Sequence, residues 1–113
     1  MELKILVEGK EEIQHFLSIV QLGILEALEE KIMTIEEAEG YLFNPYSVEK
    51  LEELGIDQRV IDIVSHGCEL EDVQSLIPDK LFTTIKKLKE ETSRNLQVLP
   101  KPSLPVNKLI KNN

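Results

Sequence analysis

The sequence predicts a mainly α-helical domain of about six helices, several of them short, in an irregular or orthogonal array. Apolar residues recur at helical spacing through most of the chain, and helix-start and helix-stop residues separate the periodic stretches. The length of 113 residues and the 42% hydrophobic content suit one compact domain, expected over residues 1–97. The pattern also leaves room for a minor strand pair formed by the two termini.

The first residues alternate between apolar and polar side chains. Leu3, Ile5 and Val7 occupy every second position before Gly9, as in a short strand. A run this short also fits the start of a helix, so the sequence leaves open whether residues 2–7 form a strand or a helix.

Residues 11–31 give the clearest helix. Its apolar residues cover most of the circumference and are Ile13, Phe16, Leu17, Ile19, Val20, Leu22, Ile24, Leu25, Ala27 and Leu28. The narrow polar side consists of Gln14, Ser18 and Gln21. We expect a central core helix, and an exposed part of its apolar side would favour a homodimer. Gly23 costs the helix about 1 kcal/mol relative to alanine, which indicates close approach of another helix.

Short helices follow, with recognisable boundaries. Thr34 and Glu37 match the capping-box pattern. Asn44 before Pro45 ends one helix and starts the next, because asparagine caps a helix and proline suits its first position. Later boundaries are marked by Gly55, Asp57, Gly67 and Pro78. The glycines are expected to close helices, and a further short helix is expected over residues 69–77.

Residues 79–96 predict the last helix, and a Pro-containing basic tail follows over residues 98–113. We expect this tail to be extended or disordered. Its P-x-P-x-x-P pattern, from Pro100 to Pro105, is also typical of segments that dock in aromatic grooves, although the disordered end is favoured. Residues 95–99 could add a strand beside the N-terminal one.

The charge is distributed unevenly along the chain. Residues up to Asp79 include 19 acidic and five basic residues, a net charge of −14, whereas the remainder carries +6. An acidic body repels a phosphate backbone, which makes nucleic-acid binding unlikely. The basic last third either complements the acidic body internally, which is favoured, or serves as an arm for an acidic partner.

The chain has one cysteine, Cys68, so an intramolecular disulfide cannot form. A lone thiol favours a reducing compartment. No signal-peptide pattern is visible, and the most apolar stretch, residues 13–28, is too polar to span a bilayer. The sequence therefore predicts a cytoplasmic protein with no membrane association.

Two motifs, LFNPYS at residues 42–47 and CELEDVQSLIP at residues 68–78, lie within the run from Ile35 to Asp79. On these motifs the chain resembles a family of small, functionally uncharacterised bacterial proteins of about this length. The resemblance implies a complete small bacterial protein. It implies no site residues.

Catalytic, cofactor and metal motifs are not evident. His66 and Cys68 place an imidazole near a thiol, but neighbours in sequence are rarely positioned as base and nucleophile, so a structural pair is favoured. The acidic residues beside them lack the spacing of a hard-cation loop. We therefore predict no catalytic residue, no cofactor and no metal.

The aromatic residues Phe43 and Tyr46, with Tyr41 nearby, are the candidate interaction residues. Aromatic side chains that the core does not need often anchor interfaces. The alternative is that Phe43 and Tyr46 fill the core at the joint between two helices, and this alternative is favoured.

These observations favour a small, acidic, non-catalytic module for protein–protein interaction, of an immunity, antitoxin or regulatory kind. Its partner would be another protein with basic character, with a homodimer as a further option. The alternative function is a small-ligand binder or enzyme with a site near Tyr46, His66, Cys68 and Asp72. A weaker alternative is a nucleic-acid-associated regulator that uses the basic C-terminal third.

Overall fold

The computed structural model describes residues 1–103 and 108–112, and it confirms a mainly helical fold with a small strand pair from the termini. The elements are β1 (Lys4–Ile5), α1 (Lys10–Glu29), α2 (Ile35–Tyr41), α3 (Pro45–Glu53), α4 (Gln58–Gly67), α5 (Leu70–Leu76), the 3-10 helix η1 (Pro78–Lys80), α6 (Leu81–Val98) and β2 (Ile110–Lys111). Joining consecutive helices reduces the helix count to four, somewhat below the six expected.

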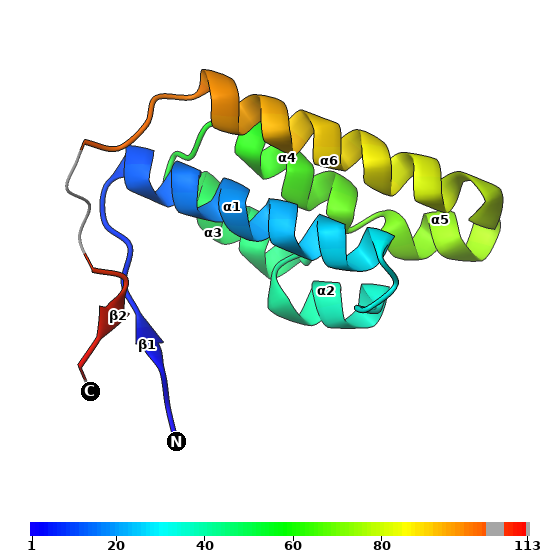
Figure 1. Cartoon of the computed structure of the whole chain (residues 1–113), viewed down its shortest axis with the longest axis horizontal. Coiled ribbons are helices and arrows are strands. Elements are labelled where there is room, and N and C mark those ends of the chain that lie inside the picture. The colour runs from blue at the N-terminus through cyan, green and yellow to red at the C-terminus, as the bar shows by residue number, and fades with distance from the viewer. Residues whose placement is uncertain (104–107, 113) are drawn as a thin grey trace.

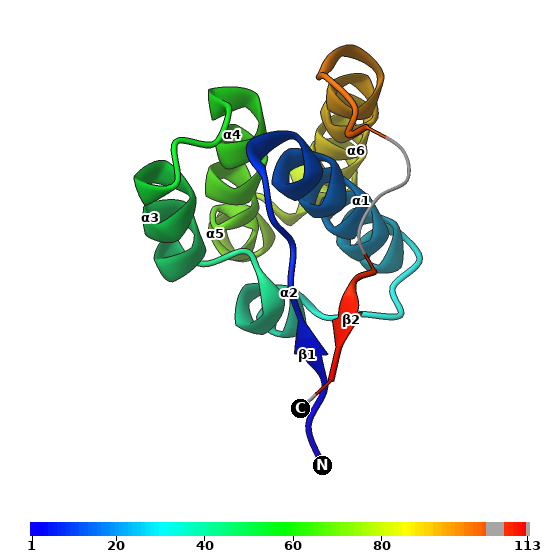
Figure 2. The same cartoon turned by 90° about the vertical axis from the view of Figure 1, so that its left-hand side faces the viewer.

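Helices α1 and α6 lie side by side along the long axis of the molecule, and α4 packs against both (Figure 1). Helix α3 packs on α4, on the side away from α6 (Figure 2). The short helices α2 and α5 lie together near the C-terminal end of α1. The core between these elements contains fully buried Leu25, Phe43, Val60, Ile63, Val64 and Leu70.

The predicted helix starts are confirmed by their hydrogen bonds. Thr34 Oγ1 accepts the N–H of Glu37 at 3.0 Å, and Glu37 Oε1 accepts the N–H of Thr34 at the same distance, which completes a capping box. Asn44 Oδ1 accepts the N–H of Ser47 at 2.8 Å. Asp57 Oδ1 accepts the N–H of Arg59 at 2.9 Å. These side chains cap the starts of α2, α3 and α4.

Helix α1 is a core helix, as expected, and its narrow polar side is buried as well. Gln14, Ser18 and Gln21 are almost fully enclosed, whereas Ile19 on the other side is half exposed. Gly23 also faces outward, and a Cβ built there meets nothing within 4 Å among the described residues. The close helix approach expected at Gly23 is therefore absent from the described part of the chain.

Gly67 is the last residue of α4, but it does not end the helix through a left-handed conformation. A Cβ at this position would lie 2.5–2.8 Å from ring atoms of Phe43. The glycine is needed because the aromatic ring packs directly on the helix backbone.

The N-terminal strand is confirmed, but its suggested partner at residues 95–99 was wrong. Residues 95–98 belong to α6, and β1 instead pairs antiparallel with β2, with Lys4 opposite Lys111 and Ile5 opposite Ile110. The predicted boundary between a domain over residues 1–97 and a tail over residues 98–113 stays a prediction.

Part of the predicted tail, residues 104–107 and 113, lies outside the described residues, and so does Pro105 of the proline pattern.

Candidate functional site

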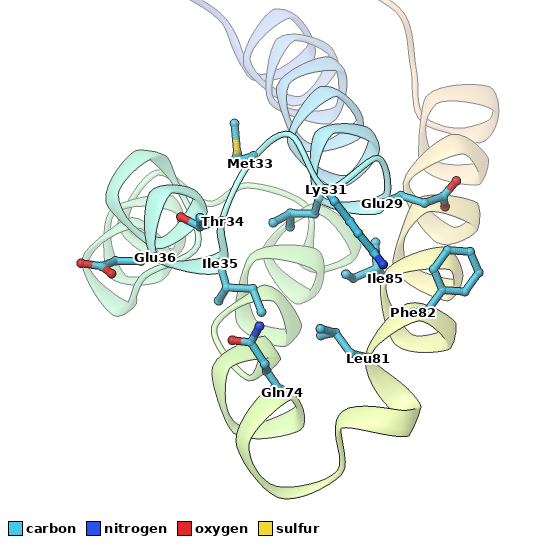
Figure 3. A pocket seen from close by; sticks show the side chains of 11 residues that line it. Glu29, Lys31, Met33, Thr34, Ile35, Glu36, Gln74, Leu81, Phe82 and Ile85 are labelled. Carbon is cyan, nitrogen blue, oxygen red and sulfur yellow. The ribbon is translucent and has the colours of Figure 1, made fainter.

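A cleft of about 480 Å³ opens at the end of the molecule where α1, α2, α5 and α6 meet (Figure 3). Its walls come from the end of α1 and the following loop, the start of α2, one residue of α5 and the first turns of α6. The lining residues are Leu28, Glu29, Lys31, Met33, Thr34, Ile35, Glu36, Gln74, Leu81, Phe82 and Ile85.

The lining of the cleft is largely apolar. Leu28, Ile35 and Ile85 are buried at the bottom, and Phe82 is more than half exposed. Ile32, Leu76 and Ile77 are also more than half exposed, but they do not line the cleft. A largely apolar hollow with a few polar groups is typical of a binding site.

A second hollow of about 460 Å³ adjoins the cleft and shares Ile35, Glu36 and Gln74 with it. Its other lining residues are Glu39 of α2 and Glu71 of α5. A hydrogen bond with the Glu71 carboxyl raises the pKa of Glu39, and partial burial and the Glu71 charge act in the same direction. Two carboxyl groups held this close repel each other when both are ionised, so this border would be stabilised by a cation.

Lys31 borders the cleft with an unusual backbone. Its φ of 61° is left-handed, a conformation that disfavours residues with a Cβ. Its N–H bonds the Leu28 carbonyl at 3.1 Å, and the next N–H, of Ile32, bonds the Ala27 carbonyl at 3.0 Å. These bonds close α1 in the manner usually provided by glycine. The Lys31 side chain extends across the cleft toward Ile85 and Phe82 (Figure 3).

One acidic cluster beside the cleft is already occupied by a lysine. Carboxylate oxygens of Glu26, Glu29 and Glu30 lie within 4.8 Å of one another. Lys89 of α6 forms ion pairs with Glu26 and, at 3.2 Å, with Glu29. Because the Lys89 ammonium forms ion pairs with two of the three carboxylates, their proximity is explained by the contact between α1 and α6.

The candidate interaction residues predicted from the sequence separate into two groups. Phe43 is only 1% exposed and fills the core, which is the alternative that the sequence favoured for it. Tyr41 and Tyr46 are 73% and 68% exposed, and the Lys50 ammonium lies 5.5 Å from the centroid of the Tyr46 ring. The core position favoured for Tyr46 was therefore wrong, because its side chain lies on the surface. The two tyrosines stay available for contacts, but neither lines the cleft.

His66 lies in the last turn of α4, and Cys68 is the residue that caps this helix. Partial burial raises the pKa of the Cys68 thiol, and the negative charges of Glu39 and Glu69 raise it further. A raised pKa keeps the sulfur protonated, which is unfavourable for a nucleophile. None of the clefts described above contains either residue.

The cleft could not be found by its sequence pattern, since its lining residues come from segments around positions 28–36, 74 and 81–85. One sequence signal was present. Leu76, Ile77 and Phe82 are large apolar residues close together around the end of α5 and the start of α6, and all three are exposed.

No helix in the described part of the chain is both long and apolar enough to cross a bilayer. Neither the curated proteins nor the solved structures contain a significant match. A family of proteins of unknown function, DUF3969, matches residues 8–111. The match spans all the helices and β2 and begins after β1, and the chain belongs to the DUF3969 family.

Proposed function

We propose that this protein is a small, non-catalytic interaction module whose cleft binds a segment of another protein with both apolar and basic side chains. The observation that supports the proposal is the composition of the cleft: an apolar floor, the exposed side chain of Phe82, and carboxylates of α2 and α5 along one border.

Each part of the cleft favours a different feature of the partner. Full burial of a phenylalanine side chain stabilises a complex by about 1.5–3 kcal/mol, so contacts with Phe82 would supply a large share of the affinity. Glu36, Glu39 and Glu71 would attract lysine or arginine and accelerate association at low salt. Residues 1–79 carry a net charge of −14, which would also attract a basic partner, over a longer range.

The lone Cys68 favours a cytoplasmic location for this role. Neutralisation of a basic toxin, as by immunity proteins and antitoxins, and regulation of a basic protein both fit such a partner. The raised pKa of Cys68 gives no support to the enzymatic alternative.

The test is affinity capture from a cell lysate at low and moderate salt, followed by titration of the purified partner. Phe82→Gln and Glu36→Gln change two exposed residues that line the cleft, where folding should be unaffected. Leu54→Gln, at the exposed end of α3, is the matched control. We expect one partner in near-equal amount, weakened by salt and by both cleft variants but not by the control.

A partner that binds the cleft variants as tightly as the native chain would place the interface elsewhere and contradict the proposal. The absence of any stoichiometric partner under native conditions would also count against it.

A further inference from the structure

The ribbon formed by β1 and β2 projects from the helical body (Figures 1 and 2). Leu3, Ile5 and Ile110 on this ribbon are half or more exposed. A two-stranded ribbon is only marginally stable in water, and three or more strands are normally needed for independent stability. Any further strand that pairs with the ribbon would therefore stabilise it.

The outer edge of β1 is available for such pairing. Leu6 donates its N–H to the carbonyl of Leu109 at 3.1 Å, so the backbone groups of Leu6, and of Lys4 two residues before it, face β2. Successive residues of a strand direct these groups to opposite sides. The N–H and C=O groups of Leu3 and Ile5 thus face outward, and no strand among the described residues pairs with them.

The charges on β1 select a partner strand with the same sequence. If a second copy pairs antiparallel with this edge, with Leu3 opposite Leu3, the two leucines can exchange their N–H···O bonds. Glu2 of each copy then lies opposite Lys4 of the other, on one face of the new sheet. Moving the two-fold axis by one residue places Lys4 opposite Lys4, or Glu2 opposite Glu2, and like charges directly opposite are destabilising.

The same alignment relieves a repulsion inside each chain. Lys4 lies opposite Lys111 in the ribbon, which brings two like charges together. Glu2 lies on the same side of β1 as Lys4, and its carboxylate is 3.9 Å from the Lys4 ammonium. A second copy would add another carboxylate on the outer side of Lys4, so that positive and negative groups alternate across the central two strands.

From this edge and these charges we infer that the protein forms a symmetric homodimer in which β1 pairs antiparallel with β1 of a second copy, giving a four-stranded sheet in the order β2–β1–β1–β2. The dimer uses the same patch on both copies, so it closes on itself and does not propagate. Leu3, Ile5 and Ile110 of the two copies form one apolar face of this sheet. The cleft at the α2–α5–α6 end is not part of this interface.

The test is sedimentation equilibrium of the untagged full chain, at low ionic strength and over a concentration series. Lys4→Glu makes the contact with Lys111 attractive within one chain but turns both contacts between copies into like-charge pairs. We expect this variant to dissociate at about tenfold higher concentration than the native dimer. Within the chain the change gains an attraction to Lys111 but loses the ion pair with Glu2, so the double variant described next controls for an effect on the ribbon itself.

Two further variants complete the test. The double variant Glu2→Lys with Lys4→Glu restores opposite charges between copies, and we expect it to dimerise at least as tightly as the native chain. Lys108→Glu makes the same change of net charge outside the paired residues and should leave the dissociation constant unchanged. A native chain that stays monomeric, a dimer insensitive to Lys4→Glu, or a double variant as weak as the single one would overturn the inference.

Discussion

Gly67 and Phe43 show how a single position can be predicted correctly for the wrong reason. A glycine at the end of a helical pattern correctly marks the end of α4. The structure gives a different cause, since the Phe43 ring lies where a Cβ of residue 67 would be. The sequence pattern identifies the glycine. The Phe43 ring, however, comes from the joint between α2 and α3, 24 residues earlier in the chain, and only the fold brings the two residues together.

Gly67→Ala should destabilise the fold, because a methyl group cannot fit beside the Phe43 ring without displacing it. Overpacking of this kind typically costs about 1–3 kcal/mol. The measurement is the free energy of unfolding in urea. Gly23→Ala is the control: its Cβ meets no described atom within 4 Å, so a gain of about 0.5–1 kcal/mol is expected from helix propensity alone. Equal effects of the two variants would show that Phe43 moves freely.

Asp57 should make stability depend on acid. The Arg59 side chain, and then its backbone N–H, lower the pKa of Asp57 from 3.8 to about 2. A carboxyl group with a lowered folded-state pKa stabilises the fold above its unfolded value and loses this contribution as pH falls through the folded value. The loss should therefore occur between about pH 4 and pH 2.

Urea unfolding measured across this pH interval tests the prediction. Arg59→Gln removes the side-chain contact but keeps the backbone bond, so the fall in stability attributable to Asp57 should become smaller without disappearing. Arg94→Gln makes the same change of charge on α6 and should leave the slope as it is. A native-like slope in Arg59→Gln would assign the acid sensitivity to other carboxyl groups.

At the scale of elements, α1 was predicted as a core helix, but the burial of its polar residues was not predicted. Hydrophobic periodicity assumes that polar residues prefer water. In this fold the amides instead bind backbone groups at the helix ends: Gln21 Nε2 donates to the Val60 carbonyl at 3.0 Å, and Gln14 Oε1 accepts the Asp57 N–H at 2.8 Å. From α6, Asn95 donates to the Arg59 carbonyl at 3.2 Å. No local sequence pattern predicts these hydrogen bonds, because the donor and the acceptor of each are far apart in the sequence.

Two substitutions among the buried polar residues of α1 should change the free energy of unfolding in opposite directions. Ser18 Oγ is buried and has no hydrogen-bond partner among the described residues, so Ser18→Ala should stabilise the protein by about 1 kcal/mol. Gln14→Leu leaves the Asp57 N–H without its partner and should cost about 1–3 kcal/mol. Thermal unfolding of the two variants decides the matter; a destabilising Ser18→Ala would mean that the hydroxyl is bonded, for instance to an internal water.

For the whole molecule, the sequence predicted local features much better than long-range ones. The caps at Thr34, Asn44 and Asp57 were identified because each depends on residues two or three positions apart. The cleft was missed because it depends on how α5 and α6 meet α1 and α2. The favoured interpretation of the charge distribution, internal complementarity, is supported at one point, where Lys89 of α6 binds Glu26 and Glu29 of α1.

Lys89→Gln should lower the urea midpoint at low salt, since it removes the ion pairs that connect α6 with α1. Hydrogen bonds with Glu26 and Glu29 raise the pKa of Lys89, so the group stays charged well above neutral pH. The difference from the native chain should shrink as salt screens the charges. Lys87→Gln, an exposed neighbour on the same helix, should leave the midpoint unchanged. The same loss in both variants would indicate an effect of net charge alone.

The joining of β1 to β2 also has a consequence for the order of folding. Almost the whole chain lies between Lys4 and Lys111, so their pairing closes a loop nearly as long as the protein itself. Contacts of such high sequence separation carry a large entropic cost until the intervening chain is compact. The helices should therefore assemble first and the ribbon last, and amide hydrogens of the ribbon should exchange with solvent well before those of α1, α4 and α6.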